Sequence, residues 1–265
     1  MHRFMTFVLI LAAIFSVQLA AATAVTANIT SNTTWNAAGS PYQLNKASGN
    51  VIVHQGATLT IDASGGDVII EWLKDQDFVI GNGTTTGGTI VIDTGGLGGG
   101  NVYFKLYSGA NISIGELGRI TFTDPTNTTY FQPAQGSPND NWGALIFVND
   151  ATRVSDLQNC SFSKGGHDSK DAAIRVNDIE SNTPTFKDLT FDSCHTAAVR
   201  FWAKGINTLR EGGISGTFTV TNTQHVFFLD GVGIGNGVRS TTNISFPDVT
   251  GPDSPTALCE GTITV

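Results

Sequence analysis

The sequence predicts an all-β chain whose body is a right-handed parallel β-helix, a solenoid of short strands. Two observations lead to this prediction. Thirty-one glycines, with many Thr, Asn and Ser residues, separate short runs rich in Val, Ile and Phe, as strands bounded by turns require. Within these runs, apolar residues at i and i+2 place both side chains on one face of a strand. The pairs are Leu59/Ile61, Ile90/Ile92, Ile120/Phe122, Cys160/Phe162, Leu189/Phe191, Phe218/Val220 and Ile244/Phe246.

The spacing of the pairs indicates a repeat. Counted from Cys160 as i, Leu189 is i+29, Phe218 is i+58 and Ile244 is i+84, so the first two steps are equal and the third is slightly shorter. A second set runs parallel to the first, with Leu145 as i, Ile174 as i+29, Val199 as i+54 and Val226 as i+81. Periods of this size are typical of stacked repeat units. If each unit is one coil, equivalent residues stack at about 4.8 Å, and six or seven coils make a body roughly 30 Å long.

A β-sandwich or jelly roll is the alternative fold, because it also consists of many short strands separated by turns. Its hairpins give no reason for similar segments to recur at the length of a coil. Residues 172–176 (AAIRV) and 197–201 (AAVRF) recur in this way, as do 157–162 (LQNCSF) and 186–191 (FKDLTF). The recurrence favours the solenoid.

Residues 1–24 are typical of a secretory signal peptide. A positive charge at Arg3 precedes the apolar run 7–15 (FVLILAAIF), and Ala22-Thr23-Ala24 supplies a small-x-small cleavage pattern. The run is too short to span a bilayer, which needs about 20 apolar residues; a buried N-terminal helix is the alternative. We therefore expect a secreted or cell-surface protein without a membrane anchor.

The remaining residues, 25–265, are expected to form one domain, because no linker or charge block divides them. Residues 25–49 are expected to cap the N-terminal end, 50–250 to form the coils, and 251–265 to form the C-terminal end. An open solenoid end exposes apolar core and unpaired backbone groups, so a cap is needed. Trp35 and Tyr42 suit that task.

Charge and cysteine content restrict the classes of partner and the means of stabilisation. The formal net charge of −8 argues against nucleic acid and anionic membranes, which bind through Lys and Arg clusters. Three cysteines, Cys160, Cys194 and Cys259, are too few for a dense disulfide framework. Their odd number leaves at least one thiol unpaired.

Several segments carry a resemblance to a known group of proteins. Residues 29–44 (ITSNTTWNAAGSPYQL) and 49–61 (GNVIVHQGATLTI) resemble the opening of bacterial right-handed β-helix proteins of the pectate-lyase-like superfamily. Similarity to the later coils of that group appears at 118–123 (GRITFT), 141–147 (NWGALIF), 157–162 and 184–191 (PTFKDLTF). The resemblance covers residues 27–201 and implies the β-helix fold with a capped N-terminus. It implies no single activity, because the group includes lyases, hydrolases and adhesins.

The first candidate binding site is a column of two arginines. If Ile174 and Val176 point inward, Arg175 points outward, and Arg200 lies one coil further in the same column. With Asp171, Asp178 and His195 near in sequence, the pair can bind a carboxylated sugar, or serve a lyase as base if carboxylates hold calcium. A solvated arginine pair is the alternative.

Apolar residues continue this column and border it. Ile146 is expected on the rung before Arg175, and Phe227 on the rung after Arg200. Trp202 lies just beyond the inward position of Phe201, where it can stack on a sugar ring or pack within a loop.

The second candidate is the longest interruption of the pattern, residues 124–141, which contains Tyr130 and Phe131. Long ordered loops on a rigid scaffold often carry function, so these two aromatic residues are candidates for binding. The glycine-rich segment 95–101 lacks the aspartate of a calcium-binding repeat and opens no helix, so we interpret it as a tight turn. His167 next to Asp168 is expected to be a polar turn.

We therefore expect a secreted or surface-associated β-helix domain that contacts polysaccharide or a cell-surface glycan without catalysing a reaction. The alternatives are a polysaccharide lyase or glycoside hydrolase acting on an acidic polysaccharide, and a structural element of an adhesin or envelope. No residue is assigned a catalytic or metal-binding role, and no cofactor is expected. Calcium would bind only where an acidic cluster forms.

Overall fold

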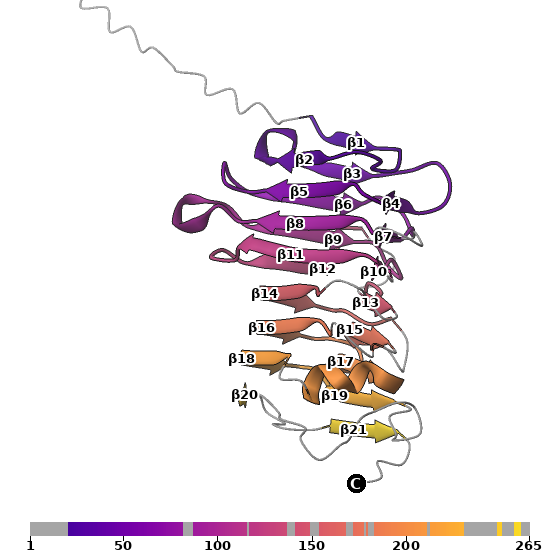
Figure 1. Ribbon diagram of the computed structural model, residues 1–265, viewed down its shortest axis with the longest axis vertical. Helices are drawn as coiled ribbons and strands as arrows, with labels where there is room; N and C mark the ends of the chain where they lie inside the picture. Colours follow the sequence, from indigo (N-terminus) through magenta and orange to yellow (C-terminus); the bar gives the residue numbers. More distant parts are fainter. Residues whose placement is uncertain are drawn as a thin grey trace, which may run out of the picture.

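The computed structural model describes residues 21–81, 87–115, 117–136, 141–148, 154–167, 172–177, 179, 183–210, 213–230, 248–250 and 257–260. The chain is a right-handed parallel β-helix of about six turns, as predicted. Figure 1 shows the coils following one another along a single axis from the indigo N-terminal end to the yellow C-terminal end. Every ladder between named strands of the described residues is parallel, so the alternative sandwich of antiparallel hairpins is wrong.

Three sheets run along the axis. Sheet A contains β1 (Thr23–Val25), β3 (Tyr42–Leu44), β6 (Val68–Trp72), β9 (Val102–Leu106), β12 (Thr129–Pro133), β14 (Asp156–Ser163), β16 (Thr185–Asp192), β18 (Ile214–Thr221) and β20 (Asp248–Thr250). Sheet B contains β4 (Val51–Val53), β7 (Phe78–Ile80), β10 (Ile112–Ile114), β13 (Leu145–Val148), β15 (Ala172–Asn177), β17 (Ala197–Trp202), β19 (His225–Asp230) and β21 (Ala257–Glu260). Sheet C contains β2 (Thr33–Asn36), β5 (Thr58–Asp62), β8 (Thr89–Asp93) and β11 (Arg119–Asp124). Short helical turns occur at η1 (Ala37–Gly39), η2 (Gly96–Gly98), η3 (Ala203–Ile206) and α1 (Asn207–Arg210).

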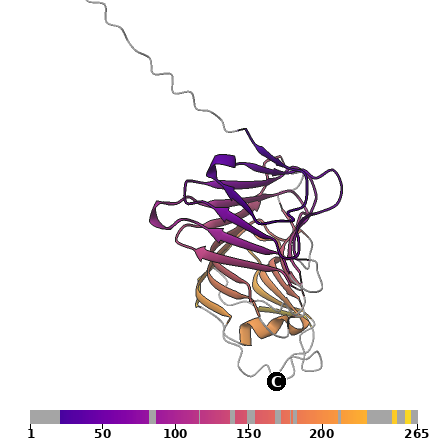
Figure 2. The same ribbon diagram turned by 45° about the horizontal axis from the view of Figure 1, so that its top comes forward.

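The sheets surround the main apolar core. Figure 2 shows the same stack of coils tilted by 45°. The predicted steps through Cys160, Leu189 and Phe218 are confirmed, because β14, β16 and β18 pair these residues in register. The next rung is occupied by Val249 of β20. The predicted fourth member, Ile244, lies outside the described residues.

Phenylalanine rings form a continuous stack inside sheet A. Phe104, Phe131, Phe162 and Phe191 lie on successive rungs, with ring centroids 4.9, 4.6 and 5.1 Å apart and planes within 13° of parallel. All four side chains are buried. Because parallel in-register strands repeat at about 4.8 Å, identical side chains on successive rungs meet face to face. The stack therefore links neighbouring coils through their cores.

Sheet C has no separate strand after β11 among the described residues, because its last rungs merge with sheet A. Each of the eight-residue strands β14, β16 and β18 runs first in the direction of the sheet C strands and then in the direction of the sheet A strands. The bend between the two parts lies at one residue of positive φ in each strand. The bend residues are Asn159 (φ 48°), Asp188 (φ 52°) and Gly216 (φ 71°). Gly, Asn and Asp are the residue types that adopt this left-handed conformation at least cost. The earlier coils turn the same corner with several residues.

The glycine-rich segment 95–101 forms a turn between β8 and β9, as predicted, but it is one of the longer corners and contains η2 instead of being tight. Gly95 and Gly96 have φ values of 69° and 66°, and η2 begins at Gly96. A side chain at Gly100 would place its Cβ 2.2 Å from the carbonyl carbon of Gly66 in the preceding coil. Glycine is therefore required there by the close approach of two backbones.

The predicted cap, residues 25–49, continues the sheets into the first coil. β2 pairs with β5, and β3 pairs with β6. The inward side chains Trp35 and Tyr42 are buried and stack on each other at 4.8 Å, and Trp35 also stacks on Phe78 at 6.2 Å. The two aromatic residues thus extend the core toward the N-terminal end.

The end of the predicted leader lies in a strand. Residues 1–20 are outside the described part of the chain, but Thr23 and Ala24 belong to β1, which pairs with β3. The backbone N–H of Thr23 donates to the carbonyl oxygen of Pro41 at 2.8 Å. Its hydroxyl donates to the carbonyl oxygen of Gly39 at 2.7 Å. Cleavage after Ala24 would remove these contacts.

If the N-terminal residues are removed as a signal peptide, we predict that cleavage follows Ala22 and that the mature chain begins at Thr23. Residues 20–22 (Ala-Ala-Ala) offer an equally suitable small-x-small pattern, and cutting there keeps all of β1. The intact mass of the protein secreted by an exporting host measures this directly. A chain that begins at Val25 would contradict the prediction.

Two cysteines are free, buried thiols. Cys160 points inward from β14, and Cys194 lies in the turn that follows β16. Burial raises the pKa of Cys160 well above its ordinary value and that of Cys194 to about 12. Both thiols therefore stay protonated at neutral pH and act as small apolar core residues.

Candidate functional site

The outward face of sheet B carries the predicted arginine column. The register aligns Arg175 of β15 with Arg200 of β17, and Ile146 and Phe228 extend the column on either side. The prediction of Phe227 in this column is wrong by one residue. Phe227 instead aligns with the inward Val199, and it takes the core position predicted for Val226.

The guanidinium group of Arg200 is held by two neighbours in the next coil. One of its terminal nitrogens, Nη2, donates to a carboxylate oxygen of Asp230 in a salt bridge. The guanidinium carbon lies 5.6 Å from the centroid of the Phe228 ring, which is itself buried. A cation over an aromatic face contributes roughly 0.5–2 kcal/mol. The charge of Arg200 is thus compensated locally, which makes it less suited to hold an acidic sugar than the sequence suggests.

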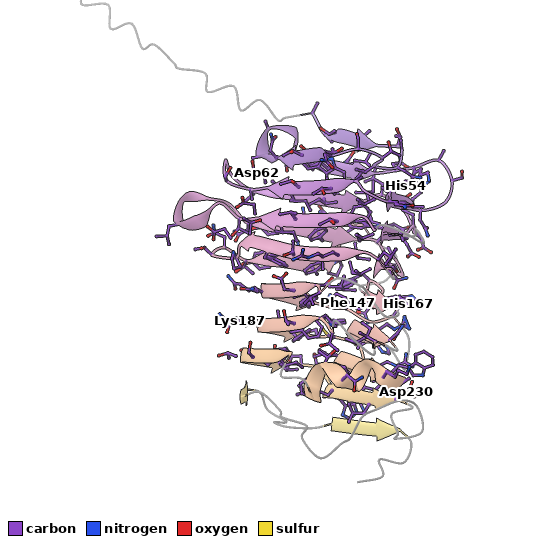
Figure 3. The ribbon with its side chains drawn as sticks, in the orientation of Figure 1. His54, Asp62, Phe147, His167, Lys187 and Asp230 are labelled. Carbon is purple, nitrogen blue, oxygen red and sulfur yellow. The ribbon has the colours of Figure 1, made fainter. Side chains whose placement is uncertain are left out.

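Trp202 lies at the outward edge of the same face. It is the last residue of β17, and 44% of its surface is exposed. The register places Asn177 on the preceding rung and Asp230 on the following one. Figure 3 shows Asp230 at this side of the solenoid. An exposed indole ring is thus flanked by an amide and a carboxylate at the inter-strand spacing of about 4.8 Å.

The other polar residues predicted near the column are only partly placed. His195 is exposed, and its Nδ1 lies 3.1 Å from the hydroxyl of Thr196. His167 is also exposed and lies on the same side of the molecule as Asp230 in Figure 3. Asp168, Asp171 and Asp178 lie outside the described residues. Within the described ranges, no three His, Cys, Asp or Glu side chains gather as a metal site would require.

Tyr130 and Phe131 do not lie in a loop. The turn after β11 spans only Pro125 to Thr128, and both aromatic residues belong to β12. Phe131 is fully buried in the phenylalanine stack, so it cannot contact a ligand, and its assignment as a binding residue is wrong. Tyr130 points outward from sheet A and stacks on Tyr103 with centroids 5.0 Å apart and planes 8° from parallel.

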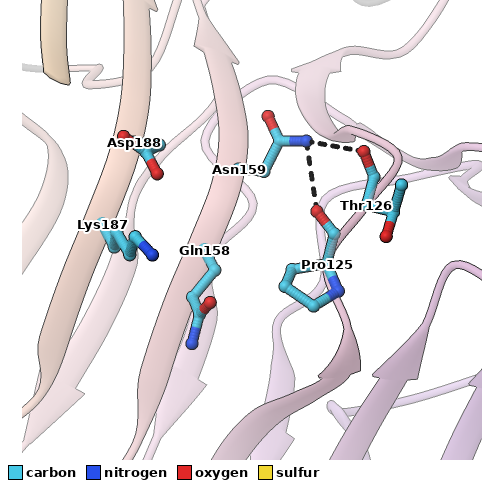
Figure 4. A pocket seen from close by; sticks show the side chains of 6 residues that line it. All are labelled: Pro125, Thr126, Gln158, Asn159, Lys187 and Asp188. Carbon is cyan, nitrogen blue, oxygen red and sulfur yellow. Dashed lines mark hydrogen bonds between the residues drawn. The ribbon is translucent and has the colours of Figure 1, made fainter. Parts of the chain in front are cut away.

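An open cleft of about 370 Å³ lies at the corner between sheets C and A. Figure 4 shows its six lining residues: Pro125, Thr126, Gln158, Asn159, Lys187 and Asp188. The side-chain amide of Asn159 donates to the carbonyl oxygens of Pro125 and Thr126, both at 3.2 Å. Asp188 accepts from the backbone N–H of Thr217 at 3.0 Å. These side chains thus hold the corners of neighbouring coils in place.

This corner is not among the sites predicted from the sequence. Asn159 and Asp188 occupy the same place in the recurring segments LQNCSF and FKDLTF, and both residue types tolerate a left-handed bend. This pattern does not identify the corner by itself, because Asn50, Asp77 and Asn111 also precede inward apolar residues and have no positive φ.

Three aspartates form a second ladder at the end of sheet C. Asp62, Asp93 and Asp124 are in register on successive strands. Each accepts a hydrogen bond from a backbone N–H two residues later, at 2.9–3.1 Å. Side-chain and backbone hydrogen bonds from Ser64 lower the pKa of Asp62, which is labelled in Figure 3. The carboxylates therefore act as turn-forming groups.

None of the helices in the described part of the chain is long and apolar enough to cross a bilayer. Comparison of the chain with protein-family models, curated proteins and solved structures finds no match in any of the three.

Proposed function

We propose that the chain is a secreted or surface-associated β-helix module that binds polysaccharide on the outward face of sheet B, with Trp202 as the stacking ring. The observation that carries this proposal is the exposed indole between Asn177 and Asp230. The C–H face of a pyranose ring is apolar and packs on an aromatic face, while its hydroxyls need donors and acceptors at the rim. The amide and the carboxylate supply both.

The charge of this face favours a neutral glycan. Asp230 compensates Arg200, and the chain carries a net charge of −8. An acidic polysaccharide would have to approach against that net charge. We further propose membership of the pectate-lyase-like superfamily, supported by the segments at 29–61 and 157–191 together with the parallel solenoid. That membership leaves the activity open.

The replacement Trp202→Ala is predicted to weaken glycan binding by about tenfold or more, which corresponds to at least about 1.4 kcal/mol. A glycan array first identifies the bound sugar, and titration calorimetry with that oligosaccharide then measures the change. Leu73→Ala is the matched control. Leu73 is exposed to a similar extent, at 42%, but it follows β6 of sheet A and so lies away from the proposed site on sheet B.

Two results would contradict the proposal: an array on which no glycan binds, or unchanged affinity in Trp202→Ala. The array includes oligogalacturonate beside neutral oligosaccharides. Preferential binding of oligogalacturonate that Arg175→Gln abolishes would instead favour the acidic-polysaccharide alternative, because Arg175 would then supply the binding charge.

A further inference from the structure

A second aromatic stack lies on the outward face of sheet A, away from Trp202. Ile69, Tyr103, Tyr130, Ser161 and Thr190 occupy one outward column on successive strands. The strands β6, β9, β12, β14 and β16 that carry them follow each other along the axis in Figure 1. The column therefore contains two stacked rings followed by small hydroxyl side chains.

The inner face of the same strands shows that the spacing between rungs allows a third aromatic ring to stack. There the stack continues from Phe131 to a further ring, Phe162, at 4.6 Å. On the outer face, the rung beside Phe162 carries Ser161, which is too small to cover the ring of Tyr130. One face of Tyr130 is packed on Tyr103, and the register places Ser161, whose side chain is smaller than a ring, on the rung at its other side.

The groups around this rung match sugar hydroxyls. Ser161 and Ser163 are partly exposed on the same face of β14, Thr190 on the following rung is exposed, and Gln132 lies on the same face as Tyr130. All four are uncharged and can donate and accept hydrogen bonds. The nearest charges in the column of Gln132 and Ser163 are of opposite sign, because Lys105 pairs with Gln132 and Asp192 pairs with Ser163. The rim therefore carries no excess of one charge that would select an ionic ligand. A flat ligand with one apolar face and hydroxyls at its edge fits this arrangement.

We propose that the rung above Ser161 is a second glycan subsite, in which one pyranose ring of a neutral oligosaccharide stacks on Tyr130 as a third member of the Tyr103–Tyr130 column. The subsite is independent of the site at Trp202, because it lies on a different sheet. Its hydrogen-bonding rim is formed by Ser161, Ser163, Thr190 and Gln132.

The test uses the full mature chain with its tyrosines replaced by 3-fluorotyrosine. The sequence contains four tyrosines, so the ¹⁹F NMR spectrum has few resonances, and Tyr130→Phe assigns the one of interest. Titration with cellohexaose, xylohexaose, mannohexaose and chitohexaose is expected to shift the Tyr130 resonance with at least one probe. Buried Tyr42 is the internal reference and is expected to stay unchanged. If none of the four probes shifts the Tyr130 resonance at millimolar concentration, the proposal is overturned.

Two variants separate this subsite from its alternatives. Tyr130→Ala removes the ring on which the sugar stacks and is expected to weaken binding of the probe by about tenfold or more. Thr219→Tyr, two rungs beyond Ser161 in the same column, leaves the subsite open and is expected to keep wild-type affinity. Wild-type affinity in Tyr130→Ala would refute the subsite. The Trp202→Ala background removes any contribution from sheet B, so failure of one site is distinguishable from failure of the other.

Discussion

Replacing Phe131 by alanine is expected to lower the free energy of unfolding by about 3–5 kcal/mol. The side chain is 0% exposed and lies in the middle of the stack, with ring centroids 4.9 Å from Phe104 and 4.6 Å from Phe162. Removing it leaves a cavity between two coils and breaks two stacked pairs, each of which adds about 0.5–1.5 kcal/mol beyond area burial. The stack is shared by successive coils, so the neighbouring rings cannot close the gap without shifting strands.

Tyr130→Ala is the matched control, since it removes an aromatic ring from the opposite face of the same strand. Its side chain is partly exposed, and a loss of about 1 kcal/mol or less is expected. Urea unfolding followed by circular dichroism measures both variants. Equal losses of stability in the two would mean that the assignment of inward and outward faces of β12 is incorrect.

The sequence was sufficient to predict the coil stack because its core positions obey two constraints at once. Residues such as Cys160, Leu189 and Phe218 must be apolar, and the nearly constant coil length sets their separation. Parallel in-register pairing then repeats the same side-chain environment on every rung. A recurring interval is therefore a direct consequence of the fold.

The register predicted from the sequence is wrong where either of two neighbouring apolar residues could occupy the core position. In β19, Val226 and Phe227 are both apolar and both buried, so the pattern alone does not decide which one follows Val199. Corner lengths also vary between coils, and the step from Val199 ends at Phe227, one position later than the pattern indicates. As a result, the residue on the rung after Arg200 is Phe228 and not Phe227 as predicted.

The sequence was sufficient to predict the positions of the candidate site residues on sheet B, but not the contacts that their side chains make. Alternation along β15 and β17 was enough to align Arg175 with Arg200 and to leave Trp202 outside. The ion pair between Arg200 and Asp230 joins two successive coils, and no local pattern marks it. The strand at Tyr130 was hidden for another reason: Pro, Asn and Gln around it are typical of loops, although outward strand positions tolerate such residues.

A series at Asn159 tests whether the single-residue corner stabilises the later coils. Asn159→Val is expected to cost about 2–4 kcal/mol, because a β-branched residue is strained at a φ of 48° and two side-chain hydrogen bonds are lost. Asn159→Gly accepts the left-handed conformation and loses only the hydrogen bonds, so about half of that cost is expected.

The difference between the two variants isolates the backbone term from the hydrogen bonds to Pro125 and Thr126, and chemical unfolding of both measures it. Asp188→Gly, at the equivalent corner one coil later, is expected to behave as Asn159→Gly does, since Gly216 already occupies the corner after it. Equal stability of the valine and glycine variants at Asn159 would contradict a left-handed bend. In that case, a left-handed residue at the corner would not explain why a single strand spans sheets C and A from β14 onward.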